Sequence, residues 1–180
     1  MKNAGKIFED CFRKSIPDYC LLIRIPDPPQ AFSQRKETKF SRKNICDFYC
    51  FQTQSQLFYA LELKSTKEKY MSFEDINSDQ PQKRMIHKHQ IIGLLNYSHY
   101  KNVIPGFFLN FRDEKKETER TYFQHITDFN IMCKRINKHS FNEIDLLTNN
   151  AIKISGNKKR IHYYWDLNGF FINTKKGELL

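Results

Sequence analysis

Two apolar segments separated by three residues constrain the fold more than any other feature of the sequence. Residues 45–52 (ICDFYCFQ) and 56–65 (QLFYALELKS) alternate in part and are rich in aromatic and branched side chains. Segments of this kind favour β-strands, and the short connection predicts that they pair as a hairpin.

Charged residues interrupt both of these apolar segments. Asp47 lies in the first, and Glu62 and Lys64 lie two residues apart in the second. Side chains two apart on a strand point to the same face, and pairing of the hairpin would bring Asp47 beside them. Because charges inside strands are costly unless they are paired or bound to a metal, the three residues predict a functional cluster.

The cluster has the chemistry of a magnesium-dependent hydrolase. Mg²⁺ prefers carboxylate oxygens, so Asp47, Glu62 and the backbone carbonyl of Leu63 are the candidate ligands. A bound ion polarises a phosphodiester and acidifies water, while Lys64 would orient that water or stabilise the transition state. The simpler alternative is an exposed hairpin face with a Glu–Lys pair that adds little stability.

The remaining periodicity predicts one domain over residues 1–180 with helices on both sides of a sheet. Strands are expected at 19–25, 103–111 and near 120–126. Helices are expected at 4–15, 82–97, 127–137 and 140–147, and 161–167 is either a strand or irregular. The order α, β, β, β, α, β predicts a mixed α/β (α+β) sheet flanked by helices.

The charge of the chain favours a polyanionic partner. Thirty Lys and Arg against twenty Asp and Glu give a net charge of +10 and a pI near 9.4. Nucleic acid and anionic membrane surfaces both attract such a chain, but no apolar run is long enough to span a membrane. The N-terminal residues lack the apolar stretch of a secretory signal, and five cysteines without a CxxC pair predict reduced thiols. We therefore expect a cytoplasmic protein, either of a bacterial cell or of a host cell if the source is viral.

Residues 28–44 predict a protruding basic arm. The segment is too long for a tight turn and too polar for the core. Its cations are Arg35, Lys36, Lys39, Arg42 and Lys43. On charge alone they either contact nucleic acid or only increase solubility.

Four short motifs together resemble the RecU family of Holliday junction resolvases. They are RIPDPPQ at 24–30, ICDFY at 45–49, LELKST at 61–66 and HKHQ at 87–90. The resemblance runs from about Gly5 to about Leu109, and the C-terminal third matches poorly. It implies a restriction-endonuclease-like PD-(D/E)xK fold, a homodimer, dependence on Mg²⁺ or Mn²⁺, and paired symmetric nicking of four-way DNA junctions.

The same resemblance implies roles for individual residues. Asp47, Glu62 and Lys64 match the catalytic trio, Gln90 matches a glutamine that supports the site, and Glu9 matches a helical acidic residue that reaches the metal through water. The basic arm matches a stalk that enters the junction, so the resemblance favours DNA contact by its cations over a merely solubilising role. One departure is Ile45, which stands where the family often has a hydroxyl residue.

Two other functions remain open on the sequence. One is a PD-(D/E)xK nuclease of different specificity, such as a restriction-like or repair enzyme. The other is a non-catalytic DNA-binding protein on the same fold. His87 and His89 lie two residues apart and do not share a helix face. We therefore expect them to lie on the helix surface or to contact phosphate, rather than to bind a metal.

Overall fold

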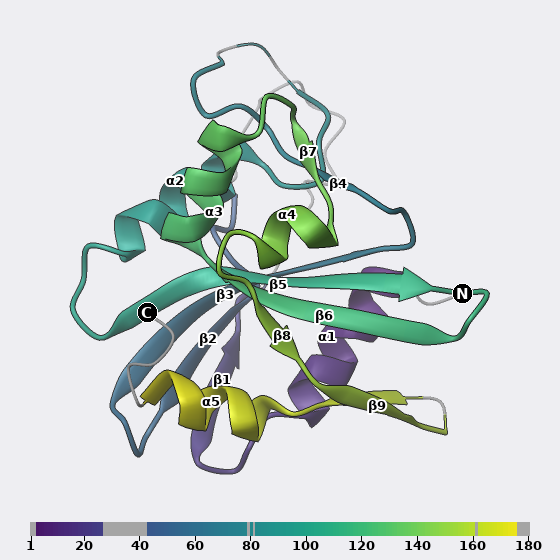
Figure 1. The fold of residues 1–180 in the computed structure, drawn as a ribbon. Coiled ribbons are helices and arrows are strands. Elements are labelled where there is room, and N and C mark those ends of the chain that lie inside the picture. Colours follow the sequence, from purple (N-terminus) through teal and green to yellow (C-terminus); the bar gives the residue numbers. More distant parts are fainter. Residues whose placement is uncertain (1–2, 27–42, 79, 81, 161, 176–180) are drawn as a thin grey trace, which may run out of the picture.

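A six-stranded sheet forms the centre of the protein (Figure 1). The computed structural model describes residues 3–26, 43–78, 80, 82–160 and 162–175. The strand order is β1-β2-β3-β5-β6-β8, with β3 and β5 parallel and the other neighbours antiparallel. The strands are β1 (Cys20–Arg24), β2 (Phe48–Gln52), β3 (Leu57–Thr66), β5 (Val103–Asp113), β6 (Thr118–His125) and β8 (Ile152–Ile154). The predicted hairpin and the mixed sheet are both confirmed.

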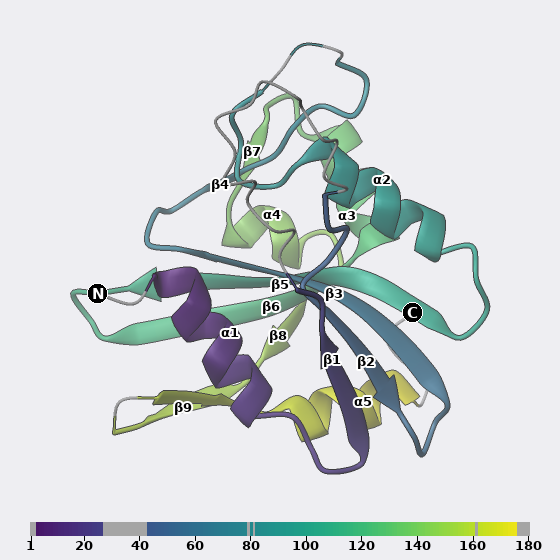
Figure 2. The same cartoon turned by 180° about the vertical axis from the view of Figure 1, so that it is seen from behind.

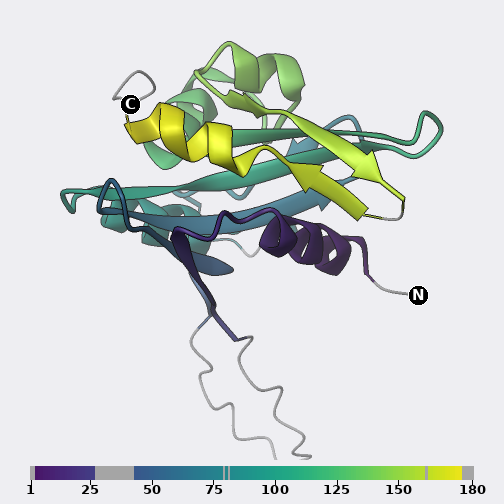
Figure 3. The same cartoon turned by 90° about the horizontal axis from the view of Figure 1, so that it is seen from below.

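Helices cover both faces of this sheet (Figures 1 and 3). On one face lie α2 (Lys88–Tyr97), α3 (Ile126–Arg135) and α4 (Glu143–Leu147). On the other lie α1 (Ala4–Lys14) and α5 (Leu167–Lys175). Each face has its own apolar core, and Phe12 of α1 packs edge-on against Phe108 of β5 with ring centroids 4.8 Å apart.

Two small ribbons complete the fold, as the reverse view shows (Figure 2). One joins β4 (Met71–Ser72) to β7 (Ser140–Phe141), and the other joins β9 (Gly156–Lys159) to β10 (His162–Trp165). All five cysteines are free thiols, as the sequence predicts. None of the helices in the described part of the chain is long and apolar enough to cross a membrane.

The expected helix over 82–97 is wrong at its start, because α2 begins only at Lys88. Just before α2, Ile86 forms a parallel bridge with Phe73, which follows β4. The Ile86 N–H donates to the Ser72 carbonyl at 3.0 Å, and the Ile86 carbonyl accepts from the Glu74 N–H at 2.9 Å. These tertiary hydrogen bonds compete with helix formation over residues 82–87.

The C-terminal region differs from expectation in three places. The expected helix over 140–147 starts at Glu143, since residues 140–141 form β7. The uncertain segment at 161–167 contains β10, whose partner β9 lacks the apolar alternation of a strand. The helix α5 is not predicted from the sequence, although its Phe170 and Phe171 are buried.

A close approach between α2 and the chain entering β2 holds these elements together. Gly93 of α2 faces Ile45, and a Cβ atom at position 93 would lie 2.5 Å from Ile45 Cγ2. Only glycine leaves room for this contact. Since Ile45 precedes Asp47 by two residues, the approach places α2 over the start of β2.

Gly93→Ala tests this packing. Alanine normally favours a helix over glycine, but here the collision with Ile45 should lower the free energy of unfolding by about 1–3 kcal/mol. Adding Ile45→Ala removes the colliding atoms, so the double variant should show a favourable coupling of about 1 kcal/mol in urea denaturation.

Gly5→Ala in α1 is the matched control, because the nearest atom to its added Cβ is 3.7 Å away. That variant should be no less stable than the parent. Equal effects of the two glycine substitutions would contradict the packing argument.

Candidate functional site

The site forms just before the start of β2, where β3 continues beyond its pairing with β2. The β2–β3 ladder has its last pair at Phe48 and Leu61, whereas β3 extends to Thr66. Beyond the ladder, a carboxylate oxygen of Asp47 accepts a hydrogen bond from the Leu63 N–H at 2.8 Å. In a strand the N–H and C=O of one residue point to the same side, so the Leu63 carbonyl also faces the side that β2 has left.

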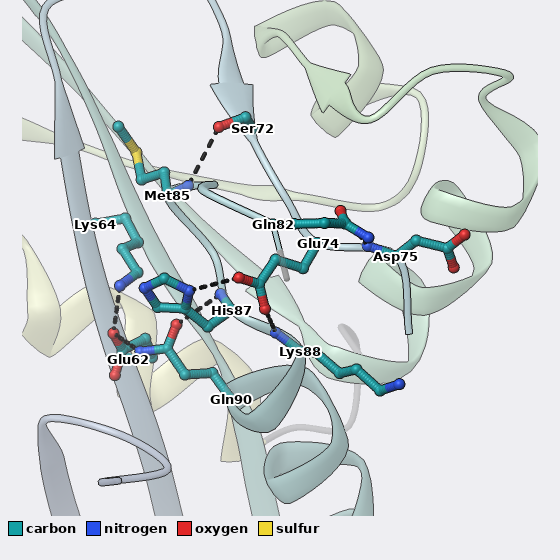
Figure 4. A network of polar contacts seen from close by, with 10 residues as sticks. All are labelled: Glu62, Lys64, Ser72, Glu74, Asp75, Gln82, Met85, His87, Lys88 and Gln90. Atoms are coloured by element: carbon teal, nitrogen blue, oxygen red, sulfur yellow. Dashed lines mark hydrogen bonds and ion pairs between the residues drawn. The ribbon is translucent and has the colours of Figure 1, made fainter. Parts of the chain in front are cut away.

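Glu62 lies beneath α2 and is almost completely buried, with 3% exposure. Lys64 Nζ lies 2.8 Å from Glu62 Oε1, and Gln90 Nε2 of α2 donates to the same oxygen at 2.5 Å (Figure 4). The structure thus brings Glu62, Lys64 and Gln90 into direct contact. An exposed hairpin face, the simpler alternative, is excluded by this burial.

Burial raises the pKa of both acidic groups in the cluster. The pKa of Glu62 rises from 4.5 to about 8 because desolvation outweighs the attraction of Lys64, and the Asp47 charge adds to the rise. Desolvation likewise raises the pKa of Asp47 from 3.8 to about 6, against the hydrogen bond from the Leu63 N–H. The cations in contact with the cluster therefore compensate its negative charge only in part.

Glu9 of α1 lies at the margin of this cluster. Its carboxylate contacts Arg24 Nε at 3.2 Å, and its charge contributes to the raised pKa of Asp47. The predicted role of Glu9 near a metal stays a prediction.

The donor set fits a hard divalent cation. Asp47 and Glu62 offer carboxylate oxygens beside the Leu63 carbonyl, and oxygen ligands of this kind suit Mg²⁺. The positive charge of such an ion would stabilise the two desolvated carboxylates in their ionised form. No group of three or more His, Cys, Asp or Glu side chains in the described ranges is arranged to hold a metal, so the backbone carbonyl and water would complete the ligand set.

Most of the predicted DNA-binding cations cannot be placed. Arg35, Lys36, Lys39 and Arg42 lie outside the described residues, as does most of the expected arm over 28–44. Lys43 is described and exposed, and its charge acts on His89 at the start of α2. Lys43, near the end of the expected arm, therefore lies close to the N-terminus of α2.

A second polar group next to the site is not predicted from the sequence. Glu74, in the chain after β4, accepts hydrogen bonds from His87 Nδ1 at 2.9 Å and from the Lys88 N–H at 2.6 Å (Figure 4). The HKHQ motif contains His87, but no sequence pattern links it to a residue thirteen positions earlier.

The raised pKa of Glu62 predicts a pH-dependent stability for the metal-free protein. A folded-state pKa above the ordinary value means that the folded protein binds more protons, so this group's contribution to stability falls as the pH rises from about 4.5 to about 8. Relative to the parent, Glu62→Gln should flatten the decline in urea-denaturation free energy over this range, measured with EDTA present. Glu114→Gln, at a residue with 61% side-chain exposure, is the control and should leave the decline unchanged. A parallel pH dependence in parent and Glu62→Gln would contradict the assigned burial.

Comparison with known proteins identifies a phage-related relative. No family model matches the chain. The chain is 31% identical over 191 aligned positions to the "SPbeta prophage-derived uncharacterized protein YotM" of Bacillus subtilis (strain 168). The alignment covers 99% of this chain and 87% of the relative. At this identity and coverage, the chain belongs to the same family as the prophage-derived protein YotM.

Proposed function

We propose that the protein is a metal-dependent DNA endonuclease of the PD-(D/E)xK type that resolves four-way junctions in the manner of RecU. The observation that carries the proposal is the convergence of Asp47, Glu62 and Lys64 at the start of β2. Burying two carboxylates side by side is costly, and Lys64 offsets the cost only in part, so a purely structural hairpin leaves the arrangement unexplained.

The arrangement of the elements supports a restriction-endonuclease-like fold. A helix, three antiparallel strands, a second helix and a parallel strand follow one another as α1, β1, β2, β3, α2 and β5, apart from the short β4. The proposed catalytic residues lie on β3 and immediately before β2, at the centre of this unit. The extensions after β5 are the part that matches RecU poorly in sequence.

Each residue of the cluster has a definable role in phosphodiester hydrolysis. Asp47, Glu62 and the Leu63 carbonyl would hold Mg²⁺ or Mn²⁺, which when bound polarises the phosphate and acidifies a water. Lys64 places its ammonium beside Glu62, where it orients the attacking water and stabilises charge that develops on the phosphate. Gln90 fixes the Glu62 carboxylate through its amide hydrogen bond.

The choice of DNA junctions rests on the charge and on the resemblance to RecU. A net charge of +10 suits a polyanionic substrate, and Lys43, from the basic segment 28–44, lies close to the start of α2. Paired nicks in a four-way junction require two active sites, so we propose a homodimer. We propose that this homodimer acts on DNA in the cytoplasm.

The chemistry is tested by nicking of a synthetic four-way junction in Mg²⁺ and in Mn²⁺. The parent should nick, and Asp47→Asn, Glu62→Gln and Lys64→Met should each reduce the rate at least about a hundredfold because each removes a group that acts in the transition state. Asp18→Asn, at an exposed residue outside the site, should nick at the parental rate. Parental activity in Glu62→Gln would show that the assigned site is wrong.

Substrate choice is tested separately with linear duplex, flap and junction DNA. Preference for the junction, with symmetric paired nicks, is the expected result. Equal or faster cleavage of linear duplex would indicate a nuclease of other specificity. Binding to DNA without nicking in either metal would leave a non-catalytic DNA-binding protein.

A further inference from the structure

Glu74 and His87 form an oriented pair at the N-terminus of α2. The Glu74 carboxylate uses one oxygen for His87 Nδ1 at 2.9 Å and the other for the Lys88 N–H at 2.6 Å. Although burial opposes it, these hydrogen bonds lower the pKa of Glu74. The carboxylate is therefore a fixed negative charge that determines the orientation of the imidazole.

The pair presents its ring outward and its carboxylate inward. The His87 side chain is 42% exposed, whereas that of Glu74 is 15% exposed. Among the described residues, no hydrogen bond is found for His87 Nε2, the ring nitrogen that Glu74 does not use. His87 is the N-cap residue of α2, and its exposed ring leaves Nε2 open to a further partner.

One side chain connects this pair to the proposed catalytic cluster. Gln90 accepts a hydrogen bond from the His87 N–H at 3.0 Å through Oε1 and donates to Glu62 at 2.5 Å through Nε2 (Figure 4). The side-chain amide of Gln90 thus bridges the start of α2 and Glu62. His89 stacks on His87, with ring centroids 5.5 Å apart. Burial and the positive charge of Lys43 lower the pKa of His89.

We propose that His87, oriented by Glu74, is a substrate-contacting residue that donates from Nε2 to a DNA phosphate beside the cluster of Asp47, Glu62 and Lys64. This inference deepens the proposed nuclease function and rests on it. The contact lies between Glu62, to which Gln90 connects it, and Lys43, whose charge acts on the neighbouring His89. The group that His87 would contact is a phosphate of the DNA backbone, so the contact positions DNA without reading its sequence.

The electrostatics of the pair suit this role. The ring offers Nδ1 to the Glu74 carboxylate and Nε2 to a phosphate oxygen, so each nitrogen faces an acceptor for a hydrogen. Hydrogen bonds to an ionised acceptor, such as a carboxylate or a phosphate, are stronger than those between neutral groups. The neighbouring charged and titratable groups are Glu74, His89, Lys43 and Lys88, and Lys88 Nζ donates to the Ser78 carbonyl at 2.9 Å.

His87→Asn separates the phosphate contact from the structural hydrogen bond. An asparagine amide reaches the position of Nδ1 and keeps a donor for Glu74, but it has no group at the position of Nε2. Affinity for junction DNA, measured in EDTA so that no cleavage occurs, should fall about threefold to tenfold. The slope of log affinity against log salt should become shallower by about 0.9, as expected for the loss of one phosphate contact.

Two further variants make the result specific. His87→Gln places an amide near the position of Nε2, so it should recover part of the affinity while the shallower salt slope remains. His99→Asn, at an exposed position after the last turn of α2, is the matched control and should behave as the parent in both measurements. Thermal unfolding of all variants checks that the fold is retained.

The outcomes for the two proposals are distinguishable. A parental affinity and salt slope in His87→Asn would overturn the His87 contact, even if the parent nicks junctions. A shallower slope in a protein that never nicks would support the contact and overturn the nuclease function. A parent with no affinity for DNA in EDTA would overturn the contact directly.

Discussion

The desolvation of two neighbouring carboxylates, Asp47 and Glu62, is the constraint on which the rest of this structure depends. Burial raises the pKa of Glu62 to about 8 and of Asp47 to about 6, even though Lys64 and the Leu63 N–H lie within hydrogen-bonding distance. A protein that needed only stability would be better served by apolar side chains at these positions. We propose that a divalent cation stabilises the ionised form of these two carboxylates, and this proposal connects the fold to the proposed nuclease.

Three features of the fold hold this unfavourable arrangement in place. The ladder between β2 and β3 stops one residue after Asp47, which frees the Leu63 N–H for its carboxylate. Gly93 lets α2 approach Ile45 closely, and Gln90 from the same helix reaches Glu62. Through Gln90 the start of α2 is also tied to His87 and Glu74, so the proposed phosphate contact and the proposed metal ligands share one rigid support.

The sequence predicts local features of this protein better than long-range ones. The hairpin and the contact between Glu62 and Lys64 follow from strand periodicity, and the convergence with Asp47 follows from pairing of adjacent segments. The start of α2 at Lys88 and the link between Glu74 and His87 do not follow, because both depend on pairing of Ile86 with the chain near β4. Nothing in the sequence around Gly93 indicates that Ile45 packs against it. The roles of Arg35, Lys36, Lys39 and Arg42 stay predictions, since these residues lie outside the described part of the chain.

The most direct test of the central claim is a crystal of the protein soaked in Mn²⁺, with the metal located by its anomalous scattering. The account predicts a peak bounded by the carboxylates of Asp47 and Glu62 and the backbone carbonyl of Leu63, and loss of that peak in Glu62→Gln. A Mn²⁺ peak elsewhere, or none at saturating metal with the two carboxylates turned apart, would contradict the account and leave a basic protein without a catalytic centre at this position.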